Sequence, residues 1–376
     1  MTTPVQHVLI IGGGFSGMAA AIELRKRGVA VDLVEIDPGW RSYGAGISLG
    51  GATLRAFRTL GILDEFLRRG AASDGVGIFA PHGPQVGRVP TPRVAGPDVP
   101  GGGGIMRQAL ASILAEATTA AGTTVHLGCS VATLTQDADG VDVVFKNGHQ
   151  ARYDLVIGAD GLYSATRGMI FPDAPKPAYS GQGVWRAVLP LLAGVDGAMM
   201  WMGPKIKTGL NPVSPAEMYL FVTENRAENT HVDPAGFVPM LKDLLAPFPA
   251  PLMQEVRAQL GEHSQITYRP LEALLLPQPW FKGRVVLIGD AVHATTPHMA
   301  SGACIGIEDA LVLADEIGKA GRLQDALQAF QARRWERCRM VVENSARLGD
   351  IEIGGGDKAE HAQIMRASMM KLAEDI

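Results

Sequence analysis

The sequence predicts an α/β protein: a Rossmann-type nucleotide-binding domain, interrupted by an inserted domain of antiparallel strands and closed by C-terminal helices. Three observations predict this arrangement. The apolar strand Val8–Ile11 leads into a glycine-rich turn and then a helix. A long stretch that mixes strands and loops is followed by a second apolar strand, which ends at Asp290, and the pattern after Gly302 is helical. We therefore expect a first part of the nucleotide-binding domain at 1–178, an inserted domain at 179–270, and the return of the first domain with the C-terminal helices at 271–376.

Composition and charge exclude several classes of protein. The chain has 376 residues, enough for two packed domains, and a net charge of -4, which gives no basic surface for nucleic acid. No apolar run reaches the roughly 18 residues of a membrane span. The three cysteines lie far apart, without the spacing of a disulfide framework or a metal site. We expect a cytoplasmic protein, monomeric or homodimeric, without a metal and without nucleic-acid or membrane partners. The Pro- and Gly-rich stretch 81–104 is expected to form an exposed, mobile loop.

The first strand and the turn after it carry a dinucleotide-binding motif. The turn is Gly12-x-Gly14-x-x-Gly17, and the next strand ends at Glu35. Gly12 permits the tight turn, Gly14 lets the backbone approach a pyrophosphate, and Gly17 lets the helix pack close to the strand. The helix N-terminus offers free amides to the phosphates, and Glu35 is placed to accept hydrogen bonds from an adenosine ribose. NAD and FAD both use this arrangement.

The strand that ends at Asp290 distinguishes between these two cofactors. After the insertion it returns to the nucleotide-binding sheet, and ligands of such sheets collect at the carboxyl ends of the strands. A carboxylate at that edge can bind the hydroxyls of an extended ligand that lies between the domains. FAD carries such a polyol, its ribityl chain, and NAD does not. The position of Asp290 therefore favours FAD.

Several motifs, taken in chain order, resemble those of a known family. They are the glycine turn with Glu35, GAGI at Gly44–Ile47, MRQAL around Arg107, GADGLYSATR from Gly158 to Arg167, and GDAVHATTPHMASGACIGIEDA from Gly289. From Val8 to about Arg339, the chain resembles the flavin-dependent aromatic hydroxylases, the class A flavoprotein monooxygenases with the p-hydroxybenzoate hydroxylase fold. The string TPHMASGACIGIED is most similar to the branch that contains the 6-hydroxynicotinate and salicylate hydroxylases.

The resemblance implies where FAD binds. Asp160 belongs to the second fingerprint of the family, and Asp290 to the third, where it holds the ribityl chain. The loop 297–303 lines the isoalloxazine ring, with backbone amides directed at the atoms that gain negative charge on reduction. In this loop the chain has Ala300-Ser301-Gly302 where the family often has Gly-Gln-Gly. The expected FAD-binding residues are Gly12, Gly14, Phe15, Ser16, Gly17, Glu35, Arg41, Arg107, Asp160, Gly289, Asp290, Pro297, Gly302 and Ala303.

The resemblance also implies a reaction. In this family FAD accepts a hydride from NADH or NADPH and then reacts with O2 to give a C4a-hydroperoxide. That species hydroxylates a small aromatic or N-heteroaromatic substrate of phenolic or hydroxy-acid character. The protein must bind the substrate, take its proton and exclude water. Because the chain has only one dinucleotide motif, we expect the nicotinamide cofactor to bind transiently.

Five residues are candidates for handling the substrate. His298 titrates near neutrality on the flavin loop, and Tyr219 lies on a strand whose alternate side chains face inward, so we expect both to be catalytic. Lys207 and Arg186 can neutralise a substrate carboxylate, and Met200 can line an apolar wall. The competing interpretations are a structural loop histidine, a core tyrosine, solvated surface charges and a core methionine.

The sequence leaves two alternatives for the activity. Baeyer–Villiger oxidation and epoxidation use the same fold and cofactor, because the peroxide can act as a nucleophile or as an electrophile. An NAD-dependent dehydrogenase, an enzyme of a different class, also fits the glycine turn with Glu35. Such an enzyme would be colourless after purification, whereas a flavoprotein would be yellow.

Overall fold

The nucleotide-binding sheet forms where the sequence predicts it. The computed structural model describes residues 4–203 and 205–376, and its first sheet has the order β18-β19-β12-β1-β2-β8. All neighbouring strands are parallel except β18 and β19. The residues Val8, Leu9 and Ile10 of β1 are fully buried, as expected for a parallel strand covered on both faces. The strands are β1 (His7–Ile11), β2 (Ala30–Glu35), β8 (Thr124–Leu127), β12 (Leu155–Gly158), β18 (Phe281–Lys282) and β19 (Val285–Leu287).

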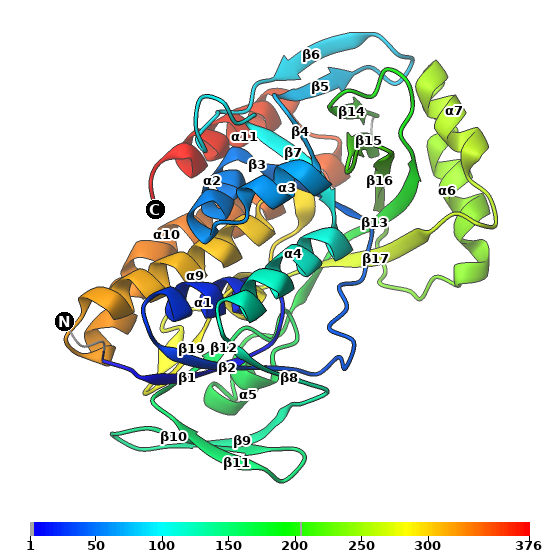
Figure 1. Cartoon of the computed structure of the whole chain (residues 1–376). Coiled ribbons are helices and arrows are strands. Elements are labelled where there is room, and N and C mark those ends of the chain that lie inside the picture. The colour runs from blue at the N-terminus through cyan, green and yellow to red at the C-terminus, as the bar shows by residue number, and fades with distance from the viewer. Residues whose placement is uncertain (1–3, 204) are drawn as a thin grey trace.

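Helices cover this sheet on both sides. Figure 1 shows α1 (Phe15–Lys26), α4 (Arg107–Ala120) and α9 (Gly302–Lys319) on one side and the short α5 (Ala165–Ile170) on the other. Since α1 begins directly after the glycine turn and packs against both α4 and α9, its N-terminus is fixed at the edge of the sheet. It ends before Gly28, whose φ of 78° stops the helix. The predicted α/β class with a Rossmann-type domain is confirmed.

A seven-stranded sheet forms the inserted domain, with the order β17-β13-β16-β15-β14-β5-β6. Its neighbouring strands are antiparallel except β14 and β5. One face packs against α6 (Phe237–Leu245) and α7 (Pro251–Gln259) to form a second hydrophobic core. The strands are β13 (Ala178–Pro190), β14 (Ala198–Met202), β15 (Lys207–Pro212), β16 (Glu217–Asn225), β17 (Ile266–Ala273), β5 (Val76–Phe79) and β6 (Gln85–Val89).

The inserted sheet takes two of its strands, β5 and β6, from the part of the chain that we assigned to the nucleotide-binding domain. β6 also lies within the stretch 81–104, so the prediction of a loop throughout that stretch is wrong. The reason is that β6 is an edge strand whose side chains are mostly exposed, so no apolar alternation marks it in the sequence.

The remaining elements complete the frame around the site. A small sheet has the order β3-β7-β4, an antiparallel meander has the order β11-β10-β9, and the region after Gly302 is helical as predicted. α10 packs against both α9 and α11. Among the described residues, no helix is long and apolar enough to cross a membrane. These elements are β3 (Gly46–Gly50), α2 (Gly51–Leu60), α3 (Leu63–Arg69), β4 (Ala71–Ser73), β7 (Gly102–Met106), β9 (Val131–Gln136), β10 (Val141–Phe145), β11 (Gln150–Tyr153), η1 (Pro234–Gly236), α8 (Asp290–His293), η2 (Pro297–Met299), α10 (Leu323–Gly354) and α11 (Lys358–Ala373).

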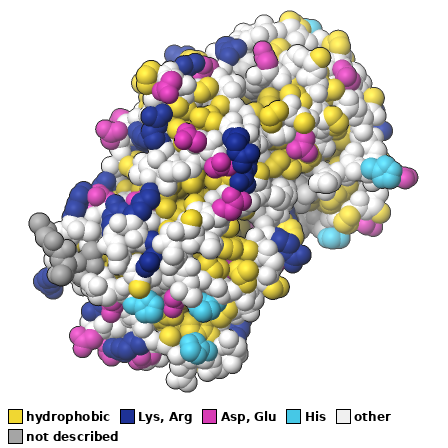
Figure 2. All heavy atoms as spheres, in the orientation of Figure 1, with side chains coloured by type: hydrophobic (Ala, Val, Ile, Leu, Met, Phe, Trp, Pro, Cys, Tyr) yellow, Lys and Arg dark blue, Asp and Glu magenta, His cyan; other side chains and the backbone are white. Residues whose placement is uncertain are grey.

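The surface carries charges of both signs. On the face shown in Figure 2, Lys and Arg side chains are interspersed with Asp and Glu, and hydrophobic side chains lie between them. This agrees with the small net charge of -4 and provides no single-sign field on that face.

Candidate active site

A cavity of about 730 Å³ extends from the glycine turn after β1 to the open face of the seven-stranded sheet. It therefore joins the predicted nucleotide site to the inserted domain. A cavity of this size can hold a ligand of considerable length. The predicted site residues that line it are Gly14, Phe15, Ser16, Arg107, Arg186, Met200, Lys207, Tyr219, Asp290, Pro297, His298, Gly302 and Ala303.

The glycine turn has the geometry that a pyrophosphate requires. A Cβ atom on Gly12 would lie 2.4 Å from the Ala159 carbonyl oxygen, and one on Gly17 would lie 2.0 Å from the carbonyl oxygen of Gly12. Both glycines are therefore needed for the packing of the turn. Nothing lies within 4 Å of the Cβ position of Gly14, so a ligand can approach the backbone there. No side chain caps the N-terminus of α1, which leaves its first amides available to phosphate.

Two predicted cofactor residues near this turn lie outside the cavity lining. Glu35 ends β2 and accepts hydrogen bonds from the backbone amides of Gly13 and Asp37, both at 2.8 Å. It therefore stabilises the turn itself. Arg41 is exposed and pairs with Asp37 at 3.1 Å. Their expected contacts with FAD remain predictions.

Asp290 and Arg107 face the cavity without partners for their polar side-chain atoms. Neither side chain makes a hydrogen bond to another residue in the described part of the chain. Desolvation raises the pKa of the Asp290 carboxyl, and His293 and Arg107 oppose that shift. Desolvation also lowers the pKa of Arg107. An unpaired carboxylate and an unpaired guanidinium in one cavity are the groups that a ribityl chain and a pyrophosphate would satisfy, so the site fits FAD.

The loop 297–303 lines the cavity along its whole length. Ala300 has a φ of 49°, a left-handed conformation that favours glycine. Ser301 Oγ donates to the Met299 carbonyl at 2.8 Å, so it does not cap α9. The first amides of this helix, at Gly302 and Ala303, therefore remain free and carry the positive end of the helix dipole. They suit the pyrimidine edge of a flavin, where negative charge appears on reduction.

Two predicted flavin motifs have structural roles in this conformation. The Asp160 carboxylate accepts hydrogen bonds from Thr166 N and Thr166 Oγ1, both at 2.9 Å, and so stabilises the start of α5. Its neighbours Ala159 and Gly161 line the cavity, but Asp160 does not. Gly289 has a φ of 63°, and its amide donates to Asp309 Oδ2 at 2.9 Å. These contacts fix the turns that carry the cavity-lining residues.

A buried ionic network lies beneath the turn at Asp290. His293 Nε2 lies 2.5 Å from Asp309 Oδ2, and Arg334 Nε donates to Asp309 Oδ1 at 2.8 Å. Burial alone would lower the pKa of His293, but Asp309 outweighs it and the pKa is raised well above its ordinary value. His293, Asp309 and Cys338 lie close enough to hold a cation. A protonated imidazole and a guanidinium already satisfy the carboxylate, however, so this cluster is structural.

Arg186 is the cation best placed for an anionic substrate. It lies on β13, lines the cavity, and has no anionic partner among the described residues. Desolvation lowers its pKa to about 10, so it stays protonated at neutral pH. Met200, on β14, lines the same cavity.

Tyr219 faces the cavity, whereas Leu220 packs in the second core, as strand alternation predicts. Its hydroxyl lies 2.6 Å from Ser48 Oγ, to which Asn211 Nδ2 donates at 2.8 Å. Burial raises the pKa of Tyr219, with Ser48 opposing, so the phenol remains protonated at neutral pH. Tyr219 can therefore serve as a hydrogen-bonding group and not as a phenolate base.

Lys207 and His298 meet at a buried carboxylate that the sequence analysis did not identify. Glu352, on α10, lies 2.6 Å from Lys207 Nζ, 3.5 Å from His298 Nε2 and 3.2 Å from His361 Nε2. Burial alone would raise the pKa of Glu352, but Lys207 and the two histidines lower it well below the usual range. The charge of Lys207 is thus already neutralised, and its predicted contact with a substrate carboxylate remains a prediction.

His298 is hydrogen-bonded through Nδ1, and its other ring nitrogen faces a carboxylate. Nδ1 lies 2.8 Å from Thr296 Oγ1, and Nε2 faces Glu352. Desolvation, and then Lys207, lower the pKa of His298, so the ring is neutral at pH 7. Thr296 lines the cavity, which places its hydroxyl between the cavity and the imidazole.

Comparisons with known proteins agree with this site. The model of a family described as FAD binding domain matches residues 6–345. The aurachin C monooxygenase/isomerase of Stigmatella aurantiaca is 32% identical over 92% of this chain and 89% of its own. The 2-heptyl-3-hydroxy-4(1H)-quinolone synthase of Pseudomonas aeruginosa is also 32% identical, over 92% of this chain and 90% of its own. Klebsiella pneumoniae HpxO, solved with FAD and uric acid, superimposes with a TM-score of 0.83 at 25% identity, covering 98% of this chain and 93% of its own.

Proposed function

The chain is a member of the FAD-dependent aromatic hydroxylase family, and from that membership we propose that it uses NADH or NADPH and O2 to hydroxylate an aromatic ring that carries an acidic hydroxyl. An N-heteroaromatic ring is favoured over a benzoate. One similar protein is named for a quinolone and another was solved with uric acid, and both compounds are oxygen-bearing nitrogen heterocycles. The assignment to the 6-hydroxynicotinate and salicylate branch remains a prediction.

The observation that carries this proposal is the continuity of the cavity. Asp290 and the free amides at the start of α9 face the same space as Arg186 and Tyr219. A cofactor held by the first group would therefore share one cavity with a ring held by the second. This arrangement suits oxygen transfer, because a reactive oxygen species must be kept from water until it meets the substrate.

The protein and FAD have separate tasks. FAD, when bound, supplies hydride acceptance and oxygen activation, which side chains cannot provide. The turn at Gly14–Ser16 and the N-terminus of α1 would hold the pyrophosphate, and Asp290 the ribityl chain. The amides of Gly302 and Ala303 would hold the pyrimidine edge of the ring.

Arg186 orients the substrate in this proposal. Its desolvated guanidinium binds the anionic or enolic oxygen of the ring through a charge-assisted hydrogen bond. Tyr219 contributes its polar hydroxyl together with Ser48, and Met200 contributes an apolar wall. An electron-rich hydroxylated ring is also the type of ring that attacks an electrophilic oxygen.

The proton of the substrate hydroxyl can leave the cavity through Thr296. Thr296 Oγ1 lies between the cavity and neutral His298, so a proton can pass through the hydroxyl to Nδ1. The carboxylate of Glu352 faces the other ring nitrogen and stabilises the imidazolium that forms. His298 therefore acts as the base through Thr296, since neither of its nitrogens is directed freely into the cavity.

The test uses FAD-loaded protein with NADH or NADPH and a panel of hydroxyquinolines, hydroxypyridine carboxylates, hydroxybenzoates and uric acid. We expect at least one compound to accelerate cofactor oxidation without matching H2O2 release, and to gain one oxygen atom from ¹⁸O2 on a ring carbon. Insertion of that oxygen between two carbons would instead indicate a Baeyer–Villiger reaction. Substrate-dependent reduction of NAD⁺ without O2 uptake would indicate a dehydrogenase. If every compound leaves the rate unchanged, the proposed substrate class is wrong.

Variants of Arg186 separate substrate binding from cofactor binding. Arg186→Met should weaken substrate binding by about 10- to 100-fold, because a hydrogen bond to a charged group contributes a free energy of that size. Arg186→Lys should lose less substrate affinity than Arg186→Met, because lysine keeps the positive charge. Both variants should keep their FAD content. Equal affinity of wild type and R186M for the substrate would contradict the assignment.

A further inference from the structure

The charged residues that line the cavity come from a few elements. They are located on β13, β15, β17 and at the starts of α4 and α8. The described charged residues of the lining are Arg107, Arg186, Lys207, Arg269, Glu272 and Asp290. This charged part contains the proposed FAD site and the anion-binding Arg186.

A second part of the lining contains no charged side chain among the described residues. It is formed by Ser73–Val76, Thr91–Val94, Gly101–Gly103, Met199 and the inner face of α11. Two charged residues lie within these segments, but Asp74 and Arg93 pair with each other at 2.5 Å and do not line the cavity. We call this region the uncharged part of the cavity.

The segments of the uncharged part are connected by direct contacts. β4 pairs with β7, which places Ser73 opposite Gly102. A Cβ atom on Gly51 would lie 2.4 Å from the Pro92 carbonyl oxygen, so the start of α2 lies against the segment 91–94. α2 in turn holds the end of α11, because Arg55 Nη1 donates to the Ala373 carbonyl at 3.0 Å. The lining is thus one continuous wall.

α11 contributes one apolar face to this wall. Met365, Met369 and Leu372 all line the cavity, and their spacing of four and three residues places them on one side of a helix. Met370, the residue directly after Met369, is 61% exposed and lies on another side of the helix. The apolar character of α11 toward the cavity is therefore confined to a single face.

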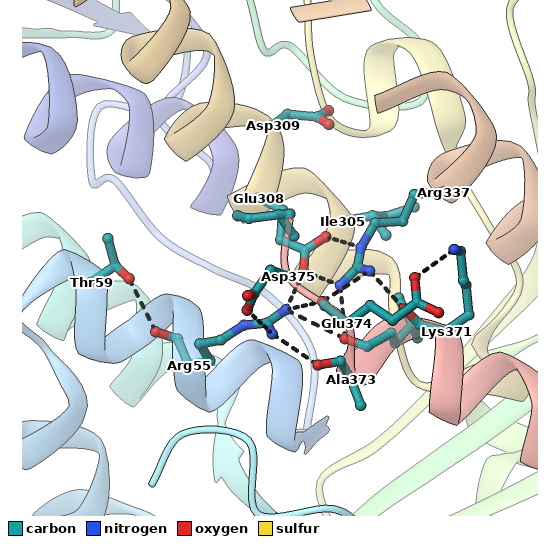
Figure 3. Close-up of polar contacts among 12 residues, drawn as sticks. Arg55, Thr59, Ile305, Glu308, Asp309, Arg337, Lys371, Ala373, Glu374 and Asp375 are labelled. Carbon is teal, nitrogen blue, oxygen red and sulfur yellow. Dashed lines mark hydrogen bonds and ion pairs between the residues drawn. The ribbon is translucent and has the colours of Figure 1, made fainter. Parts of the chain in front are cut away.

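The carboxyl end of α11 is fixed by two arginines, as Figure 3 shows. Arg337 Nη2 lies 2.7 Å from Glu308 Oε1 and also donates to the Leu372 carbonyl at 2.8 Å. Arg55 Nη2 donates to the Glu374 carbonyl at 2.9 Å. The guanidinium groups thus satisfy the carbonyls that a helix end leaves free, and they oppose its negative dipole end.

The remaining length of α11 is also fixed. Arg347 pairs with Glu360 at 2.7 Å, and Asn344 Nδ2 donates to Ser368 Oγ at 2.9 Å, both across the contact with α10. His361 reaches the buried Glu352 at 3.2 Å. With contacts at both ends and in the middle, α11 is a fixed wall whose apolar face is available to a ligand.

We propose that the uncharged part of the cavity binds a hydrocarbon substituent on the substrate, with Met365, Met369 and Leu372 of α11 as its wall. This inference rests on the proposed function and narrows its substrate class to amphipathic compounds. The ring oxygen lies at Arg186, and an alkyl or alkenyl chain extends toward α11. A small, wholly polar ring would leave this apolar wall in contact with water, at a cost proportional to its area.

The test measures binding and turnover separately in the FAD-loaded protein. Binding is followed by the change in flavin absorbance as 2-methyl-, 2-pentyl- and 2-heptyl-4(1H)-quinolone are added, with 3-methyl-, 3-pentyl- and 3-heptylphenol as a second series. A fully buried methylene strengthens binding roughly fourfold. Because burial in the cavity is partial, we expect Kd to fall by at least about 30-fold from methyl to pentyl in one of the two series.

Two variants of adjacent residues provide the matched comparison. Met369→Lys places a charge on the cavity face and should abolish the dependence on chain length, while binding of the methyl compounds changes by less than threefold. Met370→Lys places the same charge on the exposed face and should bind like wild type. Met369→Phe, a milder change, should weaken only the heptyl compounds. FAD content and the unfolding temperature of each variant show whether it has folded.

The outcomes separate this inference from the proposed function. Chain-length dependence that is lost in M369K and kept in M370K supports the hydrocarbon site. If Kd does not depend on chain length in wild type, or if M369K keeps the dependence, the hydrocarbon site is refuted, even when methyl compounds are hydroxylated. If compounds with long chains bind tightly and yet no compound is hydroxylated, the hydrocarbon site is supported and the proposed reaction is wrong.

Discussion

Replacement of Glu352 by glutamine should destabilise the protein by removing the partner of a buried charge. Lys207 Nζ lies 2.6 Å from Glu352 Oε1, and only 8% of each side chain is exposed. In Glu352→Gln the lysine keeps its charge and loses its only close carboxylate among the described residues. Breaking a buried pair in this way costs about 3–5 kcal/mol, because the remaining charge is desolvated and uncompensated.

The expected change in melting temperature follows from the size of the protein. An unfolding entropy of about 2.1 cal/mol/K per residue means that, for 376 residues, each kcal/mol lowers Tm by about 1.3 °C. The Glu352→Gln variant should therefore unfold about 4–6 °C below wild type at pH 7. Since the pKa of Glu352 is lowered below its usual 4.5, its stabilisation is complete above that pH and is lost as the pH falls. The difference between wild type and variant should therefore shrink on acidification.

Differential scanning fluorimetry of the FAD-loaded protein measures the effect. Glu343→Gln is the matched control, because Glu343 lies on the same helix and pairs with Arg339 at 2.9 Å on the surface. An exposed pair of this kind contributes only about 0.3–0.5 kcal/mol, so this variant should melt within 1 °C of wild type. The double variant K207Q/E352Q should recover part of the loss, because it leaves no buried charge unpaired. An E352Q protein that melts like E343Q would refute the reasoning.

Three further predictions concern the cofactor and the base. Asp290→Asn should weaken FAD binding about 10- to 100-fold in a titration of apoprotein, and an unchanged Kd would show that Asp290 does not hold the ribityl chain. Gly17→Ala should yield protein without flavin, because its Cβ would lie 2.0 Å from the Gly12 carbonyl oxygen, whereas Gly168→Ala, with nothing within 4 Å, should keep FAD. Wild-type turnover should fall only below pH 6.5, where His298 becomes protonated, because desolvation holds its pKa under that ordinary value. His298→Asn should lower turnover about 100-fold and remove this dependence, and an unaltered pH profile would exclude His298 as the base.

The parts of the site that the sequence predicted are those that short segments determine by themselves. The glycine turn, Asp290 at a strand end and the loop 297–303 each combine a backbone requirement with a chemical one within a few residues. Such combinations are visible without knowledge of the tertiary structure. The structure brings all three to one cavity, together with Arg107, Arg186 and Tyr219.

The parts that the sequence did not predict depend on contacts between distant segments. Lys207 and Glu352 are separated by 145 positions, and no periodic pattern links them. Lys207 therefore looked like a free cation, and its neutralisation became visible only when α10 was placed against η2 and β13. β6 was missed for a related reason, since an exposed edge strand gains its stability from its neighbour β5 and not from an apolar face of its own.

This division also explains why family membership does not by itself determine a substrate. The part of the cavity that we propose for FAD is built from the motif segments, namely the glycine turn, the turn at Asp290 and the loop 297–303. The uncharged part is built from 73–76, 91–94 and α11, where a side chain can change without affecting the glycine turn or Asp290. Substitutions on the α11 face should therefore alter preference for chain length at constant FAD affinity, and substitutions at Asp290 should do the reverse. If Met369 variants lost FAD as readily as Asp290 variants, cofactor and substrate sites would be energetically coupled, and α11 would have to be regarded as part of the FAD site.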